Sequence, residues 1–527
     1  MYLRDVIWSD CDLIYKWAND CVTRANSFNQ DRIEYNTHIE WFKNKLSDNK
    51  CNMYILMKEN ICIGQIRVDY NGIIASISYS IAPEYRYKGY GRVMLLLIEQ
   101  KLMCENKAMI IKGLVKYENI ASQRCFEKLG YLKSNEKKYF VYTKQLYKSD
   151  REDKHMYIPY GTQSISEEDI QAVVNVLRSD YLTTGPSVGE FEKKVADYVG
   201  AKHAVAISNG TAALHAACFA AGVGKGDEVI TTPITFAASS NCAFYCGATP
   251  VFADIEADTY NISPEDIERK ITANTKAIIP VHYTGQPCDM DKIMDIAKRH
   301  NLIVIQDAAH ALGADYKGKK IGSFGDMTTF SFHPVKHITT GEGGMIMTND
   351  DELYKKLMLF RSHGITRDPE LLLNNEGGWY YEQQELGYNY RITDMQCALG
   401  ISQMNRLDEF VKRRRELVAR YNKAFENVKN VTIPFTKEGC NSSWHLYVIQ
   451  VNNRKEVYDK LHEAGIGVNV HYIPVYKHPY YQQNGYDKVC CPNAEELYKH
   501  ILSLPLYPKL TDEQQDYVIE KVIEFAK

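Results

Sequence analysis

The sequence of 527 residues lacks an apolar run long enough to cross a bilayer. Residues 1–12 already include four charged side chains, so this stretch also lacks the apolar core of a signal peptide. The 14 cysteines are scattered, and none stands in the Cys-x-x-Cys spacing that builds zinc sites or disulfide frameworks. These absences predict a cytoplasmic protein with free thiols and no metal site.

Neither sign of charge is in excess. Lys and Arg number 63 and Asp and Glu number 66, which gives a formal net charge of −3. We therefore expect no broad basic face and no nucleic-acid partner. Low-complexity tracts are missing as well, and 45% hydrophobic and 24% charged residues are typical of globular proteins. A chain of this length should contain two or three domains.

A charged stretch divides the chain. Residues 148–155 read Lys-Ser-Asp-Arg-Glu-Asp-Lys-His, which no apolar core would accept without partners. We therefore predict a domain at 1–147, a linker at 148–156 and a second domain at 157–527.

The two predicted domains differ in their apolar patterns. The first mixes helical and strand-like stretches in an α+β order. The second alternates apolar strand-like runs, such as 204–207 and 302–305, with longer helical stretches. This alternation predicts an α/β fold with a mostly parallel sheet covered by helices on both faces. Ligands of such sheets bind at the carboxyl ends of the strands.

Three short motifs in the second domain could carry chemistry. An apolar strand ends at Asp307, Lys336 lies between a Ser/aromatic strand and a glycine-rich turn, and residues 208–214 join a strand to a helix start. A lysine on a rigid loop can condense with an aldehyde when its pKa is held down, and the free amides of a helix start suit a phosphate group. Taken singly, each motif also fits an ordinary role: a capping Asp, a solvated Lys or a tight turn.

Taken together, these motifs resemble the sugar aminotransferases of the DegT/DnrJ/EryC1/StrS family. The resemblance covers residues from about 157 to 527 and rests on the runs IPYGTQSIS, SDYLTTGP, VITTPITFAASSN, PVHYTGQPCDMD, FSFHPVKHITTGEGG and ELGYNYRITDMQCALG. It implies fold type I of the transferases that depend on pyridoxal 5'-phosphate (PLP). This aspartate aminotransferase-like fold has a mostly parallel sheet and a small C-terminal α/β subdomain.

The resemblance implies a role for each motif residue. Lys336 would bind PLP covalently and move the proton between cofactor and substrate carbons, while Asp307 would pair with the pyridine nitrogen. Phe236 would stack on the ring, with a buried core aromatic as the alternative. Asn389 matches a residue that reaches the phosphate of the neighbouring subunit's cofactor, which implies a homodimer. The residues implied to hold the phosphate are Asn209, Gly210, Thr211 and Ser331.

Within the family, the resemblance is to the enzymes of pseudaminic acid biosynthesis. It implies amino transfer, with L-glutamate as donor, to carbon 4 of a UDP-linked 4-keto-6-deoxy-N-acetylhexosamine. A precursor of the perosamine or bacillosamine type is the alternative substrate. Aromatic-rich loops at the implied sugar site also fit simple interface packing. The residues implied to touch the nucleotide sugar are Tyr160, Asp180, Tyr181, Leu182, Thr183, His471 and Tyr472.

One departure from the family pattern stands next to Asp307. Many relatives carry an acidic residue where this chain has Gln306. Successive side chains of a strand point to opposite faces, so Gln306 should point away from the cofactor. We expect little catalytic effect.

A glycine-bearing loop marks a second site in the first domain. A strand ends before Arg86, Gly89, Tyr90 and Gly91, which open a helix, and Asn119 stands in a second motif downstream. Together the two motifs resemble the GNAT superfamily of N-acetyltransferases, over roughly residues 1–144. The resemblance implies that the loop amides hold the acetyl-CoA pyrophosphate and that Asn119 contacts the cofactor arm. A solvated helix cap is the alternative for the loop.

A second departure affects the proton donor of the acetyl transfer. The position that often holds a tyrosine in this superfamily holds Phe126, which leaves Tyr131 or solvent as candidates. A domain that binds without turnover is therefore an alternative. Transamination creates an amine and an N-acetyltransferase consumes one, so the fusion predicts both steps on one nucleotide sugar. A non-catalytic regulator is disfavoured because Lys336 and Asp307 are both present.

Overall fold

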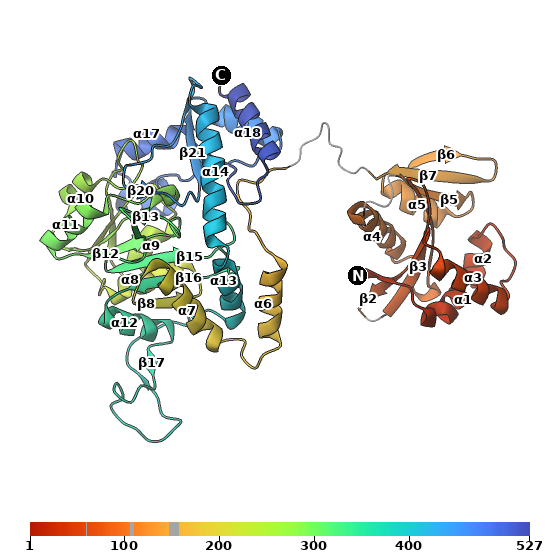
Figure 1. Ribbon diagram of the computed structural model, residues 1–527, viewed down its shortest axis with the longest axis horizontal. Coiled ribbons are helices and arrows are strands. Elements are labelled where there is room, and N and C mark those ends of the chain that lie inside the picture. The colour runs from red at the N-terminus through yellow and green to blue at the C-terminus, as the bar shows by residue number, and fades with distance from the viewer. Residues whose placement is uncertain (60, 106–109, 147–156) are drawn as a thin grey trace. The chain divides into compact units, whose positions relative to one another are not determined.

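The computed structural model describes residues 1–59, 61–105, 110–146 and 157–527, and it divides into two compact units, Met1–Lys154 and His155–Lys527 (Figure 1). The predicted linker, 148–156, lies outside the described residues.

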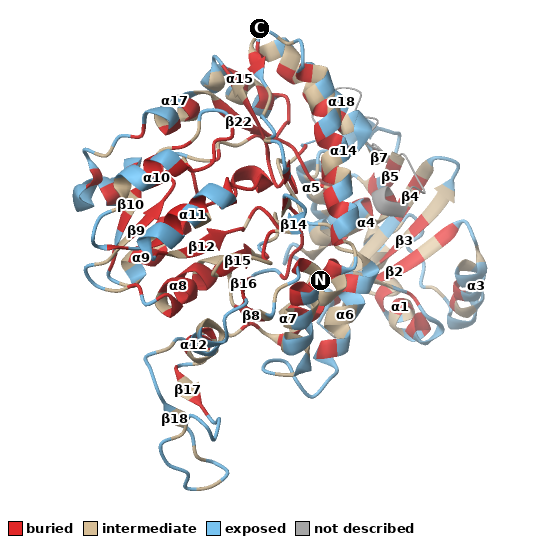
Figure 2. Ribbon diagram, turned by 60° about the vertical axis from the view of Figure 1, so that its left-hand side comes forward, coloured by how far each residue is buried: buried red, intermediate tan, exposed pale blue. Residues whose placement is uncertain are grey.

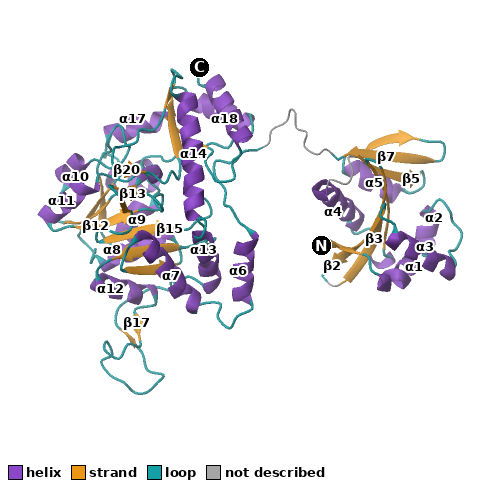
Figure 3. Ribbon diagram, viewed as in Figure 1, coloured by secondary structure: helices purple, strands orange, loops and turns teal. Residues whose placement is uncertain are grey.

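The smaller unit is an α+β domain built on one seven-stranded sheet of order β1-β2-β3-β4-β5-β7-β6 (Figure 3). Its strands are β1 (Tyr2–Asp5), β2 (Cys51–Lys58), β3 (Ile61–Asn71), β4 (Ile74–Ile81), β5 (Ile110–Lys116), β6 (Leu132–Asn135) and β7 (Tyr139–Gln145). Its helices are η1 (Trp8–Asp10), α1 (Cys11–Ala18), α2 (Cys21–Asn26), α3 (Tyr35–Ser47), η2 (Pro83–Tyr85), α4 (Tyr90–Glu105) and α5 (Ile120–Lys128).

Strands β4 and β5 form the one parallel pair among the described strands of this sheet. Their register runs from Ile74 opposite Ile110 to Ile77 opposite Gly113 and then stops, although both strands continue. Their carboxyl ends are therefore not joined by a hydrogen-bond ladder. Helices α4 and α5 begin shortly after these two strand ends, so two helix N-termini follow the unpaired part of the sheet.

The larger unit contains a seven-stranded sheet of order β10-β9-β11-β12-β15-β16-β8. Neighbours from β10 to β15 are parallel, and β16 is antiparallel to both β15 and β8. The predicted mostly parallel sheet is confirmed, with β16 as the reversed strand. These strands are β8 (His203–Ile207), β9 (Glu228–Thr231), β10 (Thr249–Phe252), β11 (Thr275–Ile279), β12 (Ile303–Asp307), β15 (Met327–Ser331) and β16 (Gly344–Thr348).

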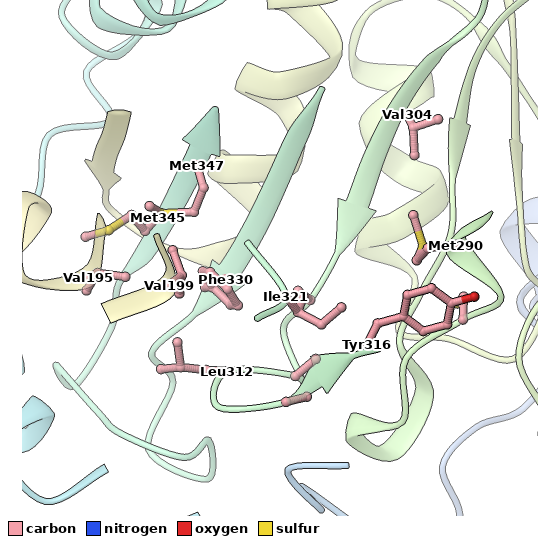
Figure 4. Packing of buried hydrophobic residues seen from close by; sticks show 14 of the residues in the cluster. Val195, Val199, Met290, Val304, Leu312, Tyr316, Ile321, Phe330, Met345 and Met347 are labelled. Atoms are coloured by element: carbon pink, nitrogen blue, oxygen red, sulfur yellow. The ribbon is translucent and has the colours of Figure 1, made fainter. Parts of the chain in front are cut away.

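Helices cover both faces of this sheet, and each face has its own apolar core. One core contains side chains of α8, α9 and α12. The other contains side chains of α7 and α11 against β12, β15 and β16, and Figure 4 shows part of it around Phe330 and Val304. The helices are α6 (Glu167–Leu177), α7 (Pro186–Val199), α8 (Gly210–Ala220), α9 (Ala238–Tyr245), α10 (Pro264–Lys270), η3 (Tyr283–Gly285), α11 (Met290–His300), α12 (Asp351–Arg361) and α13 (Asp394–Met404).

A smaller C-terminal subdomain completes the unit, as predicted. Helix α14 leads into a three-stranded sheet of order β19-β21-β22, which shares a separate apolar core with α15 and α18. No described helix is both long and apolar enough to cross a membrane. The elements are α14 (Leu407–Phe425), β19 (Val431–Thr432), β21 (Tyr447–Val451), α15 (Arg454–Glu463), η4 (Val475–Lys477), α16 (Pro479–Tyr481), η5 (Gln482–Tyr486), α17 (Pro492–His500), β22 (Ile501–Leu504) and α18 (Asp512–Phe525).

An arm, residues 365–386, projects from the larger unit (Figures 1 and 2). Strands β17 (Ile365–Thr366) and β18 (Glu382–Gln383) pair at its base. Its apolar side chains are unusually exposed: Leu373 is 85% exposed and Trp379 is 72% exposed. The remaining short strands, β13 (Asp315–Tyr316), β14 (Lys319–Lys320) and β20 (Cys440–Asn441), form a small sheet of their own.

Candidate active site

Lys336 lies on the loop that follows β15, and its side chain is half-buried inside the larger unit. Its Nζ is 3.5 Å from Nε2 of His445. Burial lowers the pKa of Lys336 to about 8, the carboxylate of Asp307 acts against this shift, and the charge of Arg414 adds to it. A sizeable fraction of the amine is therefore unprotonated near neutral pH, as a nucleophilic lysine requires.

Asp307 ends β12 at the carboxyl edge of the sheet and is buried. The Ser239 hydroxyl donates to Oδ2 at 2.6 Å, and the Ala309 amide donates to Oδ1 at 3.1 Å. Burial raises the pKa of Asp307, while these two hydrogen bonds and the Lys336 charge act against that shift. A buried carboxylate held in this way suits a cationic partner, and a protonated pyridine nitrogen is one.

Buried histidines form a neutral polar wall beside Lys336. The rings of His310 and His445 are 4.3 Å apart, and the Tyr472 hydroxyl is 3.2 Å from Nε2 of His310. Burial lowers the pKa of both histidines. Within the described residues, Nδ1 of each has no hydrogen-bond partner. Buried polar atoms usually have partners, so these two atoms mark a place for a polar ligand.

Arg414 supports this wall from α14. Its side chain is 1% exposed and donates to the carbonyls of Trp444 at 3.2 Å, His445 at 3.1 Å and Leu506 at 2.8 Å. Burial lowers its pKa to about 10. No carboxylate within the described residues forms an ion pair with it, so its charge acts on Lys336 without local compensation.

The predicted phosphate residues meet at the start of α8. Asn209 caps the helix by accepting the Ala212 amide at 2.8 Å. A Cβ on Gly210 would lie 2.9 Å from Cβ and 3.2 Å from Oγ of Ser331. The structure thus brings Asn209, Gly210 and Ser331 together, with Thr211 on the same first turn. An anion fits such a helix start because its amides and dipole are positive.

Four predicted aromatic and histidine residues gather on the same side of the unit. Phe236 is 63% exposed, so the alternative of a buried core aromatic is wrong. Its ring centroid lies 6.4 Å from that of Tyr472, and Tyr160 lies 5.3 Å from His471. A cavity of about 690 Å³ opens beside Phe236 and Tyr472, and its wall includes Thr235, Tyr245, Tyr480 and Tyr481.

Other predicted residues lie apart from this group. Asp180, Tyr181, Leu182 and Thr183 occupy the exposed loop between α6 and α7, where the Leu182 carbonyl accepts the Asp394 amide at 3.1 Å. Asn389 is exposed near the base of the arm. Among the described residues, no hydrogen bond or ring contact joins these side chains to Lys336 or Asp307.

Gln306 faces away from the site, as strand alternation predicts. Its Oε1 lies 3.0 Å from Nε2 of His282, and its Nε2 donates to the Phe324 carbonyl at 2.6 Å. Both contacts lie on the opposite face of β12 from Asp307. Gln306 therefore serves the packing of the sheet.

Ser239, His445 and Arg414 are site residues that the sequence did not reveal. Ser239 lies 68 positions from Asp307, and His445 lies 109 positions from Lys336. Only the fold brings them together. His310 did have a signal, because it stands three residues after Asp307 in the same motif.

In the smaller unit, the predicted loop and Asn119 lie at two neighbouring helix starts. Gly91 is in the first turn of α4, and a Cβ there would lie 3.3 Å from the Cys125 sulfur of α5. Asn119 caps α5 by accepting the Ser122 amide at 3.1 Å. The amides of a helix start have no partner within the helix, so these two neighbouring helix starts could together bind an anion.

The Arg86 side chain is taken up by other contacts. It forms an ion pair with Asp20 and donates to Thr23 at 3.0 Å and to the Ile81 carbonyl at 3.1 Å. Its contribution to anion binding is therefore limited to its backbone, while its guanidinium fixes the loop to α2.

The fold and the two sites define a fusion of an aminotransferase with an acetyltransferase domain. Residues 163–523 match the DegT/DnrJ/EryC1/StrS aminotransferase family, and residues 1–132 match the acetyltransferase (GNAT) domain. The chain belongs to the DegT/DnrJ/EryC1/StrS aminotransferase family and is a PLP-dependent aminotransferase with an N-terminal acetyltransferase domain.

Named relatives agree with this assignment. The chain is 46% identical to the spore coat polysaccharide biosynthesis protein SpsC of Bacillus subtilis (strain 168), covering 70% of this chain and 97% of SpsC. It is 40% identical to the UDP-4-amino-4,6-dideoxy-N-acetyl-beta-L-altrosamine transaminase of Campylobacter jejuni, covering 68% and 95%. The solved structure of Helicobacter pylori PseC, an aminotransferase of pseudoaminic acid biosynthesis, superimposes with a TM-score of 0.66 at 34% identity, covering 70% and 99%.

The residues of the larger unit fit PLP. The buried carboxylate of Asp307, the unpartnered Nδ1 atoms of His310 and His445, and the helix start beside Ser331 offer partners for a ring cation, polar ring substituents and a phosphate. When bound, PLP supplies an aldehyde for an amine and a ring that withdraws electrons from the reacting carbon.

Proposed function

We propose that the larger unit transfers an amino group from L-glutamate to carbon 4 of a UDP-linked 4-keto-6-deoxy-N-acetylhexosamine. The product would be UDP-4-amino-4,6-dideoxy-N-acetyl-β-L-altrosamine, as in pseudaminic acid biosynthesis. Similarity to the Campylobacter transaminase and to PseC supports this substrate. The single structural observation that supports amino transfer is the half-buried Lys336, whose pKa of about 8 makes it a competent amine.

The proposed roles of the side chains follow from their environments. Lys336 would hold the cofactor through its aldehyde and would move a proton at the reacting carbon, because its amine is half-buried and partly neutral. Asp307 keeps the ring nitrogen protonated, and Ser239 fixes the orientation of the carboxylate. Asn209, Gly210, Thr211 and Ser331 would hold the phosphate, Phe236 would contact the ring, and Tyr160, His471 and Tyr472 would contact the sugar.

We further propose that the smaller unit acetylates the new amine with acetyl-CoA, so residues 1–147 and 157–527 act in sequence on one nucleotide sugar. The match to a GNAT domain and the two helix starts beside the open strand pair support this step. Gly89, Tyr90, Gly91, the Arg86 backbone and Asn119 would bind the cosubstrate. We place both reactions in the cytoplasm.

A homodimer forms part of the proposal. Asn389 and the loop 180–183 are exposed, which suits residues that serve the site of a second copy. The exposed apolar side chains of the arm offer a surface for that copy to cover. Sedimentation of the full chain should give twice the mass of 60.5 kDa.

A product analysis tests the two activities together. The purified protein is given the UDP-linked 4-keto sugar, L-glutamate and acetyl-CoA, and the product is examined by NMR and mass spectrometry. We expect an N-acetylated 4-amino sugar of altro configuration, and no product from the Lys336→Ala variant. A free amine without acetylation would refute the second step, and a different configuration would identify a perosamine or bacillosamine precursor as the substrate.

A further inference from the structure

Position 126, where a proton donor is common in GNAT domains, belongs to the core of the smaller unit. Phe126 is 2% exposed and stacks on Tyr142, with ring centroids 5.1 Å apart and planes at 14°. A Cβ on Gly113 would lie 2.4 Å from the para carbon of its ring. The ring therefore abuts the backbone of β5, which leaves no room there for a hydroxyl.

Tyr131, the other candidate from the sequence, is also a core residue. It is 5% exposed, and its ring lies edge-on to Phe126 at 4.8 Å. Burial and the nearby Glu99 carboxylate raise its pKa, and Lys144 lies 5.3 Å from the centre of its ring. Tyr131 thus lies beside the charged pair of Glu99 and Lys144.

Tyr79 also contacts Phe126, with ring centroids 6.2 Å apart, but its hydroxyl reaches the start of α5. It lies on β4 beyond Ile77, the last residue paired with β5. Its hydroxyl is 3.1 Å from Oγ of Ser122 at the start of α5. A Cβ on Gly91, in the first turn of α4, would lie 3.7 Å from the same hydroxyl. The phenol therefore stands between two helix starts, where β4 and β5 have parted.

We propose that Tyr79, hydrogen-bonded to Ser122, donates the proton to the thiolate that leaves acetyl-CoA. This inference rests on the proposed acetylation. The ends of β4 and β5 are not joined by a hydrogen-bond ladder, and the amides of the two helix starts beside them could bind polar groups of the cosubstrate. The Tyr79 phenol lies beside the starts of both α4 and α5.

In the proposed step, Tyr79 supplies the proton that the leaving sulfur takes up. The amine lone pair attacks the thioester carbonyl carbon, a C–N bond forms, and the C–S bond breaks with its electron pair going to sulfur. The phenol proton of Tyr79 moves to sulfur and gives the free thiol. Ser122 returns a proton to the phenolate oxygen and is resupplied by water, which also accepts the proton that the amine loses. Burial raises the pKa of Tyr79, so the phenol keeps its proton across the neutral range.

Tyr79→Phe in the full chain tests the proposal with the UDP-linked 4-amino sugar and acetyl-CoA supplied directly. We expect kcat for acetyl transfer to fall about 100-fold, the lower end of the usual effect of a general acid. Binding of acetyl-CoA by calorimetry should stay within about threefold, because the phenol acts on the leaving group. The solvent deuterium isotope effect on kcat should shrink in the variant, which a merely structural role would not cause.

Tyr142→Phe is the matched control. It also removes one hydroxyl that has a partner, since Tyr142 donates to Glu127 at 2.9 Å, but Glu127 is near the end of α5 and not at its start. We expect its acetyl transfer to stay within about twofold of wild type. Tyr79→Phe transferring at the wild-type rate would overturn the role of Tyr79 and leave the acetylation standing. A defect that vanishes at saturating acetyl-CoA would make Tyr79 a binding residue, and wild-type protein that transfers no acetyl group would overturn both proposals.

Discussion

At the scale of single residues, the aminotransferase site holds two ionisable groups that are both pushed toward their neutral forms. Burial lowers the pKa of Lys336 and raises that of Asp307. A third group that brings a positive charge to Asp307 and an aldehyde to Lys336 relieves both costs together. The site is thus electrostatically arranged for its cofactor before the cofactor binds.

The pKa of Lys336 predicts its reactivity in protein freed of cofactor. Trace acetic anhydride should label Lys336 with a midpoint at about pH 8, because the amine loses its proton as the pH rises through that value. Lys455 is the internal control, since its hydrogen bond to the Asp459 carboxylate raises its pKa and it should react only in more alkaline solution. Peptide mass spectrometry measures both. Labelling of Lys336 that begins no earlier than that of Lys455 would contradict the assignment.

Residues with a local signal could be predicted from the sequence, and those without one could not. Lys336 and Asp307 stand at strand ends within recognisable runs. His445 and Arg414 stand outside the runs that carry the resemblance, and Ser239 stands inside one without a signal of its own. The roles of all three arise from contacts between distant segments. The search for a general acid in the smaller unit meets the same limit. The sequence does not show that Phe126 and Tyr131 are both packed into the core.

At the scale of elements, the helix start of α8 should control cofactor affinity. Gly210→Ala would place a methyl group 2.9 Å from Cβ of Ser331, so one of the two must move. We expect PLP to bind about tenfold more weakly, which corresponds to roughly 1.4 kcal/mol. Fluorescence titration of cofactor-free protein measures this.

Gly224→Ala is the control for that change. A Cβ at Gly224 would meet no atom within 4 Å, so the substitution adds the same methyl group without a clash. Its PLP affinity should match that of the wild type. Equal affinities of the two variants would mean that Gly210 and Ser331 do not shape the phosphate site.

Helix α14 contributes a buried charge that no ion pair among the described residues balances. Arg414→Met would leave the carbonyls of Trp444, His445 and Leu506 without their donor. We expect a loss of roughly 3 kcal/mol in unfolding free energy. The labelling midpoint of Lys336 should also move to higher pH, because the Arg414 charge lowers the pKa of that lysine.

Arg420→Met, on the same helix, is the matched comparison. Arg420 pairs with Asp512 and Asp516 at the surface, where ion pairs contribute little. Denaturant unfolding should show a change below about 1 kcal/mol, and the Lys336 midpoint should not move. An Arg414 variant as stable as this control would show that the three carbonyls find other partners.

The arrangement of helices and strands could be predicted from the sequence, but the direction of individual strands and the exact bounds of the elements could not. The alternation of apolar runs and helices predicted the mostly parallel sheet, because buried parallel strands read as continuous apolar runs. The reversal of β16 was not visible, since Gly344–Thr348 reads like any other buried strand and its direction depends on pairing with β15 and β8. The gap between β4 and β5 likewise depends on register, which composition does not encode.

At the scale of the whole molecule, the chain carries separate apolar cores in its two units. The smaller unit contains two apolar clusters, one around Phe126 and one around Phe42. No residue of these two clusters belongs to an apolar cluster of the larger unit. Units with separate cores can unfold as separate cooperative transitions. PLP and acetyl-CoA should therefore each stabilise only the unit that binds it.

Calorimetry of the full chain tests this directly. We expect two thermal transitions, with PLP raising the midpoint of one and acetyl-CoA raising the midpoint of the other. At a free ligand concentration of about 100 times Kd, each should add about 2.7 kcal/mol to its own unit. Lys336→Ala should reduce the rise in midpoint caused by PLP, because Lys336 is the proposed covalent anchor. The rise caused by acetyl-CoA should remain. One merged transition that shifts with either ligand would instead show that the two units unfold together, and sequential catalysis would then take place within a single cooperative body.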